Sequence, residues 1–208
     1  MSFINNLVSV ANQELKLWAE GGWVECAQDK NTKQPFREQK KQPGAVRVYD
    51  YWLKGIGEKN RHGCIKLAWS AAFICWCLRN SGMKLEQFPI SGSHQAYIRW
   101  SINNSKFQKA DKSYYGRKAN EYMPRPGDII AQWRKEKVSD PNPNISYDNQ
   151  PDEFYISHCD IVVSATATSV IAIGGNVSHR VKETKFEVRN GLFVPKKEII
   201  CIMQCKMG

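Results

Sequence analysis

The sequence predicts one α+β domain, and three observations support that prediction. A chain of 208 residues is long enough to bury about 70% of its unfolded surface around one core. In the first half, apolar side chains recur at three- and four-residue steps, which is typical of amphipathic helices. In the second half, β-branched runs separated by turn residues indicate antiparallel strands. Helices followed by strands favour an α+β arrangement.

The N-terminal part predicts a helix followed by a loop. Apolar residues at mostly three- and four-residue steps predict a helix over residues 3–19, which Gly21 and Gly22 end. The polar stretch 28–45, which contains two prolines, predicts a loop. Residues 46–58 fit either a helix or a short strand.

The clearest helix is expected over residues 67–80. Its buried face has the spacing of a core helix and comprises Trp69, Ala72, Phe73, Trp76 and Cys77. Gly82 follows at the position of a C-cap glycine. Another helix is expected over residues 93–102, and the basic, tyrosine-rich stretch 103–122 predicts a surface excursion.

The second half predicts strands. Residues 128–133 follow a proline- and glycine-containing turn and indicate a strand. Residues 137–153, rich in Pro, Asn and Asp, predict a long exposed loop. The runs IVVSA and SVIAI indicate a hairpin. Further strands are expected over 184–189 and 198–205.

The net charge limits the classes of partner. Thirty Lys and Arg oppose twenty Asp and Glu, which gives +10 and favours polyanions such as nucleic acid, anionic membrane or an acidic wall polymer. A basic surface that merely keeps the protein soluble is the alternative. No apolar run reaches the roughly 18 residues of a membrane span. The N-terminus lacks the features of a signal peptide, so we expect a protein made in the cytoplasm that does not leave by the general secretory route.

Cysteine and histidine spacing argues against a metal site. None of the seven cysteines forms a CxxC pair, which argues against a zinc ribbon or a thioredoxin-type site. His158 and Asp160 could ligate zinc together with His94 or His62, but the usual ligand spacing is missing. We therefore expect no metal and no cofactor.

Ser70 stands near the start of the strongest predicted helix, and two interpretations are open. It could be an N-cap, whose hydrogen bond to a backbone N–H contributes about 1 kcal/mol. It could also be a nucleophile, because the unpaired amides at a helix N-terminus would stabilise an oxyanion formed beside it. A serine nucleophile needs a base, which can come from elsewhere in the sequence.

Four short motifs occur in the order WSAAF, PRPGDII, SHCDIVV and IGGNV. This series resembles the papain-like wall amidases of the CHAP and NlpC type, especially a branch that carries WCAAF, PGDI, GHV and GGN. The resemblance covers roughly residues 64–181. It implies a papain-like fold, with N-terminal helices packed on an antiparallel sheet. The implied domain spans 1–208, with a helical and basic extension over 1–60 and a catalytic core over 64–205.

The resemblance also implies roles for individual residues. Ser70 falls on the position of the nucleophilic cysteine, His158 on the base and Asn176 on the residue that orients the imidazole. Asp128 matches the aspartate of the PGD turn, which is more structural than catalytic in character. Asp160 competes with Asn176, because it shares a strand face with His158.

Serine in place of cysteine is the main departure from the family pattern, since serine depends more on its base and on oxyanion donors. Three outcomes follow: a working Ser-His-Asn site, a site that binds without cutting, or a nucleophile supplied by Cys64 or Cys75. Cys64 ranks above Cys75, which lies in the middle of the helix.

Candidate substrate-binding residues are Trp69, His94 and Tyr97. An aromatic face can stack on sugar rings or on peptide, although at helical spacing Trp69 fits a core residue better.

The expected function is a peptidoglycan hydrolase, either an amidase or a peptide endopeptidase. The resemblance suggests an antibacterial toxin that a contractile (type VI) secretion system delivers to the periplasm of a target cell. Peptidoglycan, an immunity protein and a secretion-system carrier are the implied partners. The rivals are an inactive wall-binding module and a basic nucleic-acid-binding protein that uses residues 97–118.

Overall fold

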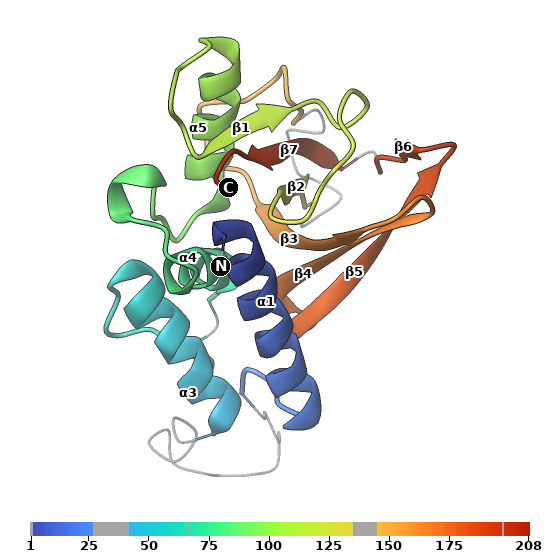
Figure 1. Cartoon of the computed structure of the whole chain (residues 1–208). Coiled ribbons are helices and arrows are strands. Elements are labelled where there is room, and N and C mark those ends of the chain that lie inside the picture. Colours follow the sequence, from blue (N-terminus) through green and yellow to red (C-terminus); the bar gives the residue numbers. More distant parts are fainter. Residues whose placement is uncertain (1, 27–41, 66, 135–144, 197) are drawn as a thin grey trace.

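A computed structural model describes residues 2–26, 42–65, 67–134, 145–196 and 198–208 (Figure 1). Helices and a curled antiparallel sheet form the two parts of the fold, so the predicted α+β class is confirmed. Most of the loops predicted at 28–45 and 137–153 lies outside the described residues. Among the described residues, no helix combines the length and the apolar character needed to cross a membrane.

The first helix, α1 (Phe3–Glu20), confirms the N-terminal prediction. Ser2 caps it by accepting the backbone N–H of Asn5, and Gly21 is its C-cap. The helix buries one stripe of side chains, which comprises Phe3, Leu7, Ala11, Glu14 and Trp18.

The helix α3 (Pro43–Asp50) continues into a π-helix, η1 (Tyr51–Ile56). Here the loop prediction is wrong from Pro43 onward, because proline in the first helical turn fits a helix start. The alternative of a strand over 46–58 is also wrong.

A buried polar network ties α1 to α3. Glu14, which is 3% exposed, accepts a hydrogen bond from Arg47 Nε (2.9 Å) and another from the Tyr51 hydroxyl. Trp18 Nε1 in turn donates to the Tyr51 oxygen at 2.8 Å. The pairing compensates the desolvation of the Glu14 carboxylate, which would be costly to bury alone.

The central helix α4 (Ser70–Asn80) is buried over most of its length. Gly82 follows with a φ of 102°, a left-handed conformation that favours glycine. Trp69 is the N-cap and Ser70 is the first helical residue, so Ser70 is not the capping residue.

The next helices are the short η2 (Leu85–Gln87) and α5 (His94–Lys106), which runs four residues further than predicted. The strand β1 (Tyr114–Arg117) then pairs with β7, so the surface excursion expected over 103–122 is partly regular structure. Tyr114 is buried, and a Cβ on Gly116 would press against Ile102 of α5. Glycine therefore lets this strand lie close to the helix.

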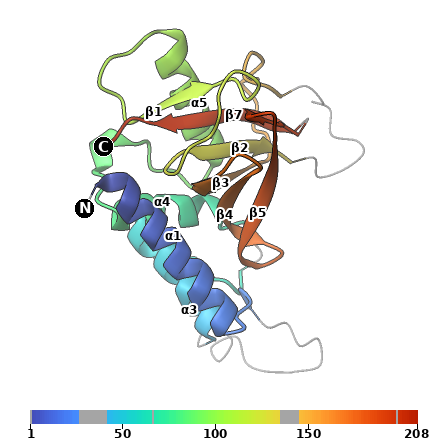
Figure 2. The ribbon, with the colours of Figure 1, turned by 45° about the vertical axis from the view of Figure 1, so that its right-hand side comes forward.

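The sheet is antiparallel throughout and has the order β1-β7-β2-β3-β4-β5-β6. Figure 2 labels all of these strands except β6. The predicted hairpin is confirmed as β3 and β4, whereas the two-residue β6 was not expected. The remaining strands are β2 (Ile129–Trp133), β3 (Ser157–Ala165), β4 (Ser169–Val177), β5 (Arg180–Arg189), β6 (Leu192–Phe193) and β7 (Ile199–Cys205).

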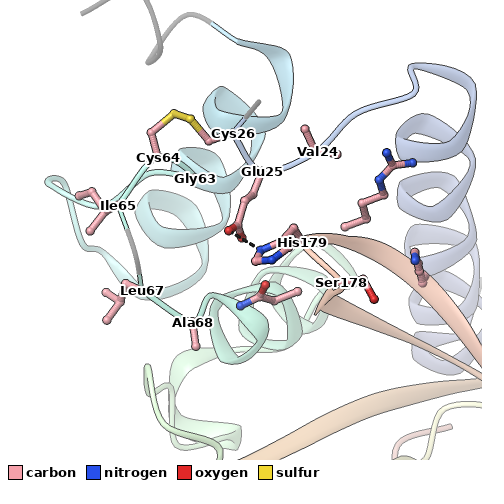
Figure 3. Close-up of a pocket in the computed structure, with 13 residues that line it drawn as sticks. Val24, Glu25, Cys26, Gly63, Cys64, Ile65, Leu67, Ala68, Ser178 and His179 are labelled. Atoms are coloured by element: carbon pink, nitrogen blue, oxygen red, sulfur yellow. Dashed lines mark hydrogen bonds and ion pairs between the residues drawn. A yellow bond between two sulfur atoms is a disulfide. The ribbon is translucent and has the colours of Figure 1, made fainter. Parts of the chain in front are cut away.

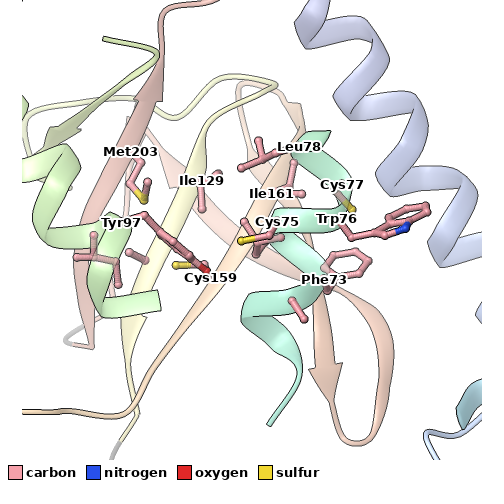
Figure 4. Packing of buried hydrophobic residues seen from close by; sticks show 14 of the residues in the cluster. Phe73, Cys75, Trp76, Cys77, Leu78, Tyr97, Ile129, Cys159, Ile161 and Met203 are labelled. Carbon is pink, nitrogen blue, oxygen red and sulfur yellow. The ribbon is translucent and has the colours of Figure 1, made fainter. Parts of the chain in front are cut away.

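The main core lies between α4 and the sheet (Figure 4). Phe73 and Trp76 of α4 belong to the same cluster as Leu7 and Trp18 of α1, so the N-terminal helix shares this core. Buried cysteines fill it as small apolar groups. The core thereby fixes α4, whose first residue is Ser70, against strands β3 and β4.

A buried serine–histidine pair

Ser70 and His94 form a direct side-chain contact at the point where α4 and α5 begin. Ser70 Oγ lies 2.7 Å from His94 Nε2. The two residues are 6% and 5% exposed. Each is the first residue of its helix, so the packing of the two helix starts creates the pair. The sequence predicts a base for Ser70 but assigns it to His158, and counts His94 among substrate-binding residues.

The surroundings of His94 favour a neutral imidazole. Burial, the neighbouring His158 and Arg134 together lower the pKa of His94 well below its ordinary value. Its Nδ1 contacts the hydroxyl of Tyr97, whose own pKa burial raises. A neutral ring that donates Nδ1–H to Tyr97 leaves Nε2 free to accept the Ser70 proton. His94 therefore meets the requirement for a general base.

A second imidazole lies beside the first. The His158 ring centroid is 5.8 Å from that of His94, with the planes at 66°. His158 Nε2 and Asp160 Oδ1 are 2.8 Å apart, and Asp160 Oδ2 accepts from Gln132 Nε2 at 2.8 Å. The predicted common strand face of His158 and Asp160 is thus observed. No hydrogen-bond partner reaches His158 Nδ1 from the described residues.

Gly174 makes room for the histidine–aspartate pair. It lies on β4, next to β3, and a Cβ there would overlap the Asp160 carboxylate and crowd His158 Nε2. The glycine of the IGGNV motif is therefore required by a side-chain contact between strands.

Asn176 is engaged elsewhere. With its amide oriented to satisfy both neighbours, Nδ2 donates to Glu25 Oε2 at 3.2 Å and Oδ1 accepts from the backbone N–H of Trp69 at 3.3 Å. The structure thus places Asp160, not Asn176, against His158. Asn176 instead secures the residue immediately before Ser70.

The cysteine alternatives lack a free thiolate. Cys64 forms a disulfide with Cys26, 38 positions away in the sequence, which contradicts its proposed role as nucleophile. Cys75 is fully buried, and burial raises the pKa of its thiol to about 11. Neither residue therefore competes with Ser70 in this structure.

Two predicted substrate-binding residues are core residues. Trp69 is fully buried and stacks on Trp18 and Tyr51, with ring centroids 5.3 and 5.6 Å apart. Tyr97 is also fully buried and serves His94. Neither side chain presents a face to a ligand.

Asp128 has a structural role. Its carboxylate accepts the backbone N–H groups of Arg125 and Cys205, both at 2.8 Å, and so joins the PGD turn to β7. Burial raises the pKa of Asp128 to about 6.

A cleft of about 350 Å³ opens at Ser70. Its walls come from the α4 start, the α5 start and the segment that leads into β3, and include Ala68, Ala71, Gly92, Phe154 and Ser157. The first amides of an α-helix have no partner within the helix, and such amides are a common source of oxyanion donors. Among the described residues, no three His, Cys, Asp or Glu side chains come together as a metal site.

Fold and site together define an α+β protein with a helix-start serine held by a buried histidine. Residues 22–204 match the model of a family described as an uncharacterized protein conserved in bacteria (DUF2272), and the chain belongs to that family. No curated protein and no solved structure matches the chain.

Proposed function

We propose that this protein hydrolyses amide or peptide bonds of the bacterial cell wall, with Ser70 as the nucleophile. The single observation that supports the chemistry best is the 2.7 Å contact between Ser70 Oγ and His94 Nε2 at the edge of an open cleft. A serine hydroxyl is a weak nucleophile unless a neighbouring base takes its proton.

The reaction follows from this geometry. His94 Nε2 accepts the Ser70 proton while Oγ attacks the carbonyl carbon of the bound amide. The resulting oxyanion is stabilised by the first amides of α4. The His94 imidazolium then returns the proton to the leaving amine, and the C–N bond breaks. Water, deprotonated by the same imidazole, hydrolyses the acyl ester and restores Ser70.

His158 and Asp160 act next to this pair as positioning residues. The carboxylate fixes the His158 ring, and that ring packs edge-on against His94. In the resembled family the histidine at the position of His158 is itself the base, and the two assignments predict different effects of mutation.

Two observations support the cell wall as substrate. Four motifs occur in the order of the wall amidases, and the net charge of +10 suits an anionic polymer. Delivery by a secretion system into the periplasm of a target cell, with an immunity protein in the producer, belongs to the same proposal and rests on the resemblance.

Digestion of purified peptidoglycan tests this function. The wild-type protein should release soluble fragments, and mass spectrometry should find new amine and carboxyl ends at one type of bond. Ser70→Ala should release none while keeping the wild-type unfolding temperature. Wall binding without cleavage by the wild type would support the inactive binding module instead. Salt-sensitive binding to arbitrary DNA, without wall binding, would support the nucleic-acid rival.

A further inference from the structure

A second, larger cleft shares the lining residue Ala68 with the cleft at Ser70, and Figure 3 shows the residues that line this larger cleft. It has a volume of about 830 Å³ and is enclosed by residues 24–26, residues 63–65, 67 and 68, and the β4–β5 turn. The Cys26–Cys64 disulfide joins two of these walls. Ala68 borders both clefts and precedes Ser70 by two residues, so the two clefts share a wall close to the proposed nucleophile in sequence.

Among the described residues that line this cleft, the one carboxylate, Glu25, is already paired. Glu25 Oε1 lies 2.6 Å from His179 Nδ1, a contact visible in Figure 3, and Glu25 Oε2 accepts from Trp69 Nε1 at 2.5 Å. Both oxygens of this carboxylate therefore have partners within the protein.

Two cations line the same cleft. Arg180 and Lys182 lie two residues apart on β5 and so share a face of the strand. None of the ion pairs formed by the described residues involves either of them. A concave surface with uncompensated positive charge favours an anionic group.

The same cleft also has an apolar part. Val24, Ile65 and Leu67 line it, and Leu67 is 41% exposed. A ligand that fits both parts carries a carboxylate together with short aliphatic groups. An acidic peptide with small side chains has this chemistry.

We propose that this cleft binds a carboxylate of an extended acidic peptide substrate whose scissile amide lies at Ser70. The proposal deepens the proposed hydrolysis and rests on it. Arg180 and Lys182 hold the carboxylate, the apolar part holds the neighbouring side chains, and Ala68 marks the passage to the catalytic cleft.

Binding is tested first, in a form that does not need catalysis. Sedimentation with insoluble peptidoglycan compares Ser70→Ala with a triple variant that also carries Arg180→Glu and Lys182→Glu. Lys109→Glu with Lys185→Glu in the Ser70→Ala background changes the net charge equally at lysines outside both clefts. The cleft variant should bind about tenfold more weakly, and the control should bind within about twofold of Ser70→Ala.

Equal weakening by both charge variants would overturn the subsite, because general charge would then explain the binding. Amidation of the peptidoglycan carboxyl groups tests the ligand without altering the protein. Ser70→Ala and the cleft variant should bind the amidated peptidoglycan with equal affinity. A difference that persists after amidation would also overturn it. If the two glutamate substitutions of the cleft variant lower its unfolding temperature, Arg180→Gln with Lys182→Gln replaces them.

Cleavage kinetics separate this proposal from the proposed hydrolysis. When Ser70 is retained, the double substitution Arg180→Glu and Lys182→Glu should raise KM about tenfold and leave kcat within about twofold of the wild-type value. If the wild type does not cleave but cleft-dependent binding remains, hydrolysis fails and the carboxylate subsite stands. If cleavage proceeds with an unchanged KM, the subsite fails and hydrolysis stands.

Discussion

His94 Nε2 lies 2.7 Å from Ser70 Oγ although 24 positions separate the two residues in the sequence. The starts of α4 and α5 meet there, so two helix N-termini supply the serine, its partner and unpaired backbone amides to one small volume. The histidine is buried, and its lowered pKa keeps the imidazole neutral, so that it can accept a proton.

The two histidines should differ in their effect on the reaction. His94→Gln removes the group that touches Ser70, so kcat should fall by about 10²- to 10⁴-fold. His158→Gln removes a positioning group and should cost less. Initial rates of wall cleavage by variants with wild-type circular dichroism check this. A larger loss in His158→Gln than in His94→Gln would assign the base to His158, as the resembled family has it.

The protein should keep its hydrolytic activity at mildly acidic pH. His94 must be neutral to accept a proton, and its pKa is lowered below the ordinary 6.5, so protonation disables it only below that value. We expect kcat/KM at about pH 6 to remain near its maximum. An acid limb with a midpoint at or above 6.5 would contradict the assignment.

The same shift predicts how stability changes with pH. As the pH falls below 6.5, the unfolded chain protonates at His94 while the folded chain does not, so this group destabilises the folded state in that range. Urea denaturation measures the unfolding free energy at neutral pH and at about pH 5. Between these two values the unfolding free energy should fall less in His94→Gln than in the wild type. An unchanged slope would contradict a buried, neutral His94.

Gly174→Ala should damage the site from the neighbouring strand. The added Cβ overlaps the Asp160 carboxylate, and forcing a methyl group into a packed site costs about 1–3 kcal/mol. The unfolding free energy and kcat should both fall. Asp160→Asn should lower kcat while changing stability less, because an amide oxygen can still accept from His158. Full activity and stability in Gly174→Ala would show that the strand contact is unimportant.

The disulfide provides a paired test of the nucleophile. Cys26→Ser and Cys64→Ser break the same bond, which closes a segment with a sequence separation of 38, so each should lower stability equally, by about 3–4 kcal/mol. Wall cleavage below the unfolding temperature should be the same in both. Loss of cleavage in Cys64→Ser alone would return the nucleophile role to Cys64. Cys205→Ser, outside the disulfide, is the control.

Local patterns predict the elements better than they predict the site. The helix that begins at Ser70 and the β3–β4 hairpin follow from periodicity and turn residues, which are properties of neighbouring positions. The partnership of His94 with Ser70 depends on how two helix starts pack, and no sequence spacing encodes that packing. The proximity of His158 and Asp160 follows from the two-residue period of one strand, whereas the contacts of Asn176 depend on how β4 packs against the segment before α4.

Burial explains the other differences. Glu14 stands at an apolar position of α1, and its hydrogen bonds with Arg47 of α3 and Tyr51 of η1 make its burial tolerable. The Cys26–Cys64 pair has no spacing signature, because disulfide pairing depends on tertiary proximity. For Glu14, the sequence contains one sign of this pairing, namely an acidic residue on the apolar face of the predicted helix over residues 3–19.

Covalent labelling of Ser70 tests the central claim most directly. A fluorophosphonate reacts with a serine only where a base activates the hydroxyl, and the phosphonyl oxygen occupies the oxyanion position. Intact-mass and peptide-mapping spectrometry should find one adduct, on Ser70, which is absent in Ser70→Ala and forms about 100-fold more slowly in His94→Gln. No adduct above the Ser70→Ala background, or an equal labelling rate in His94→Gln, would contradict a nucleophile activated by His94.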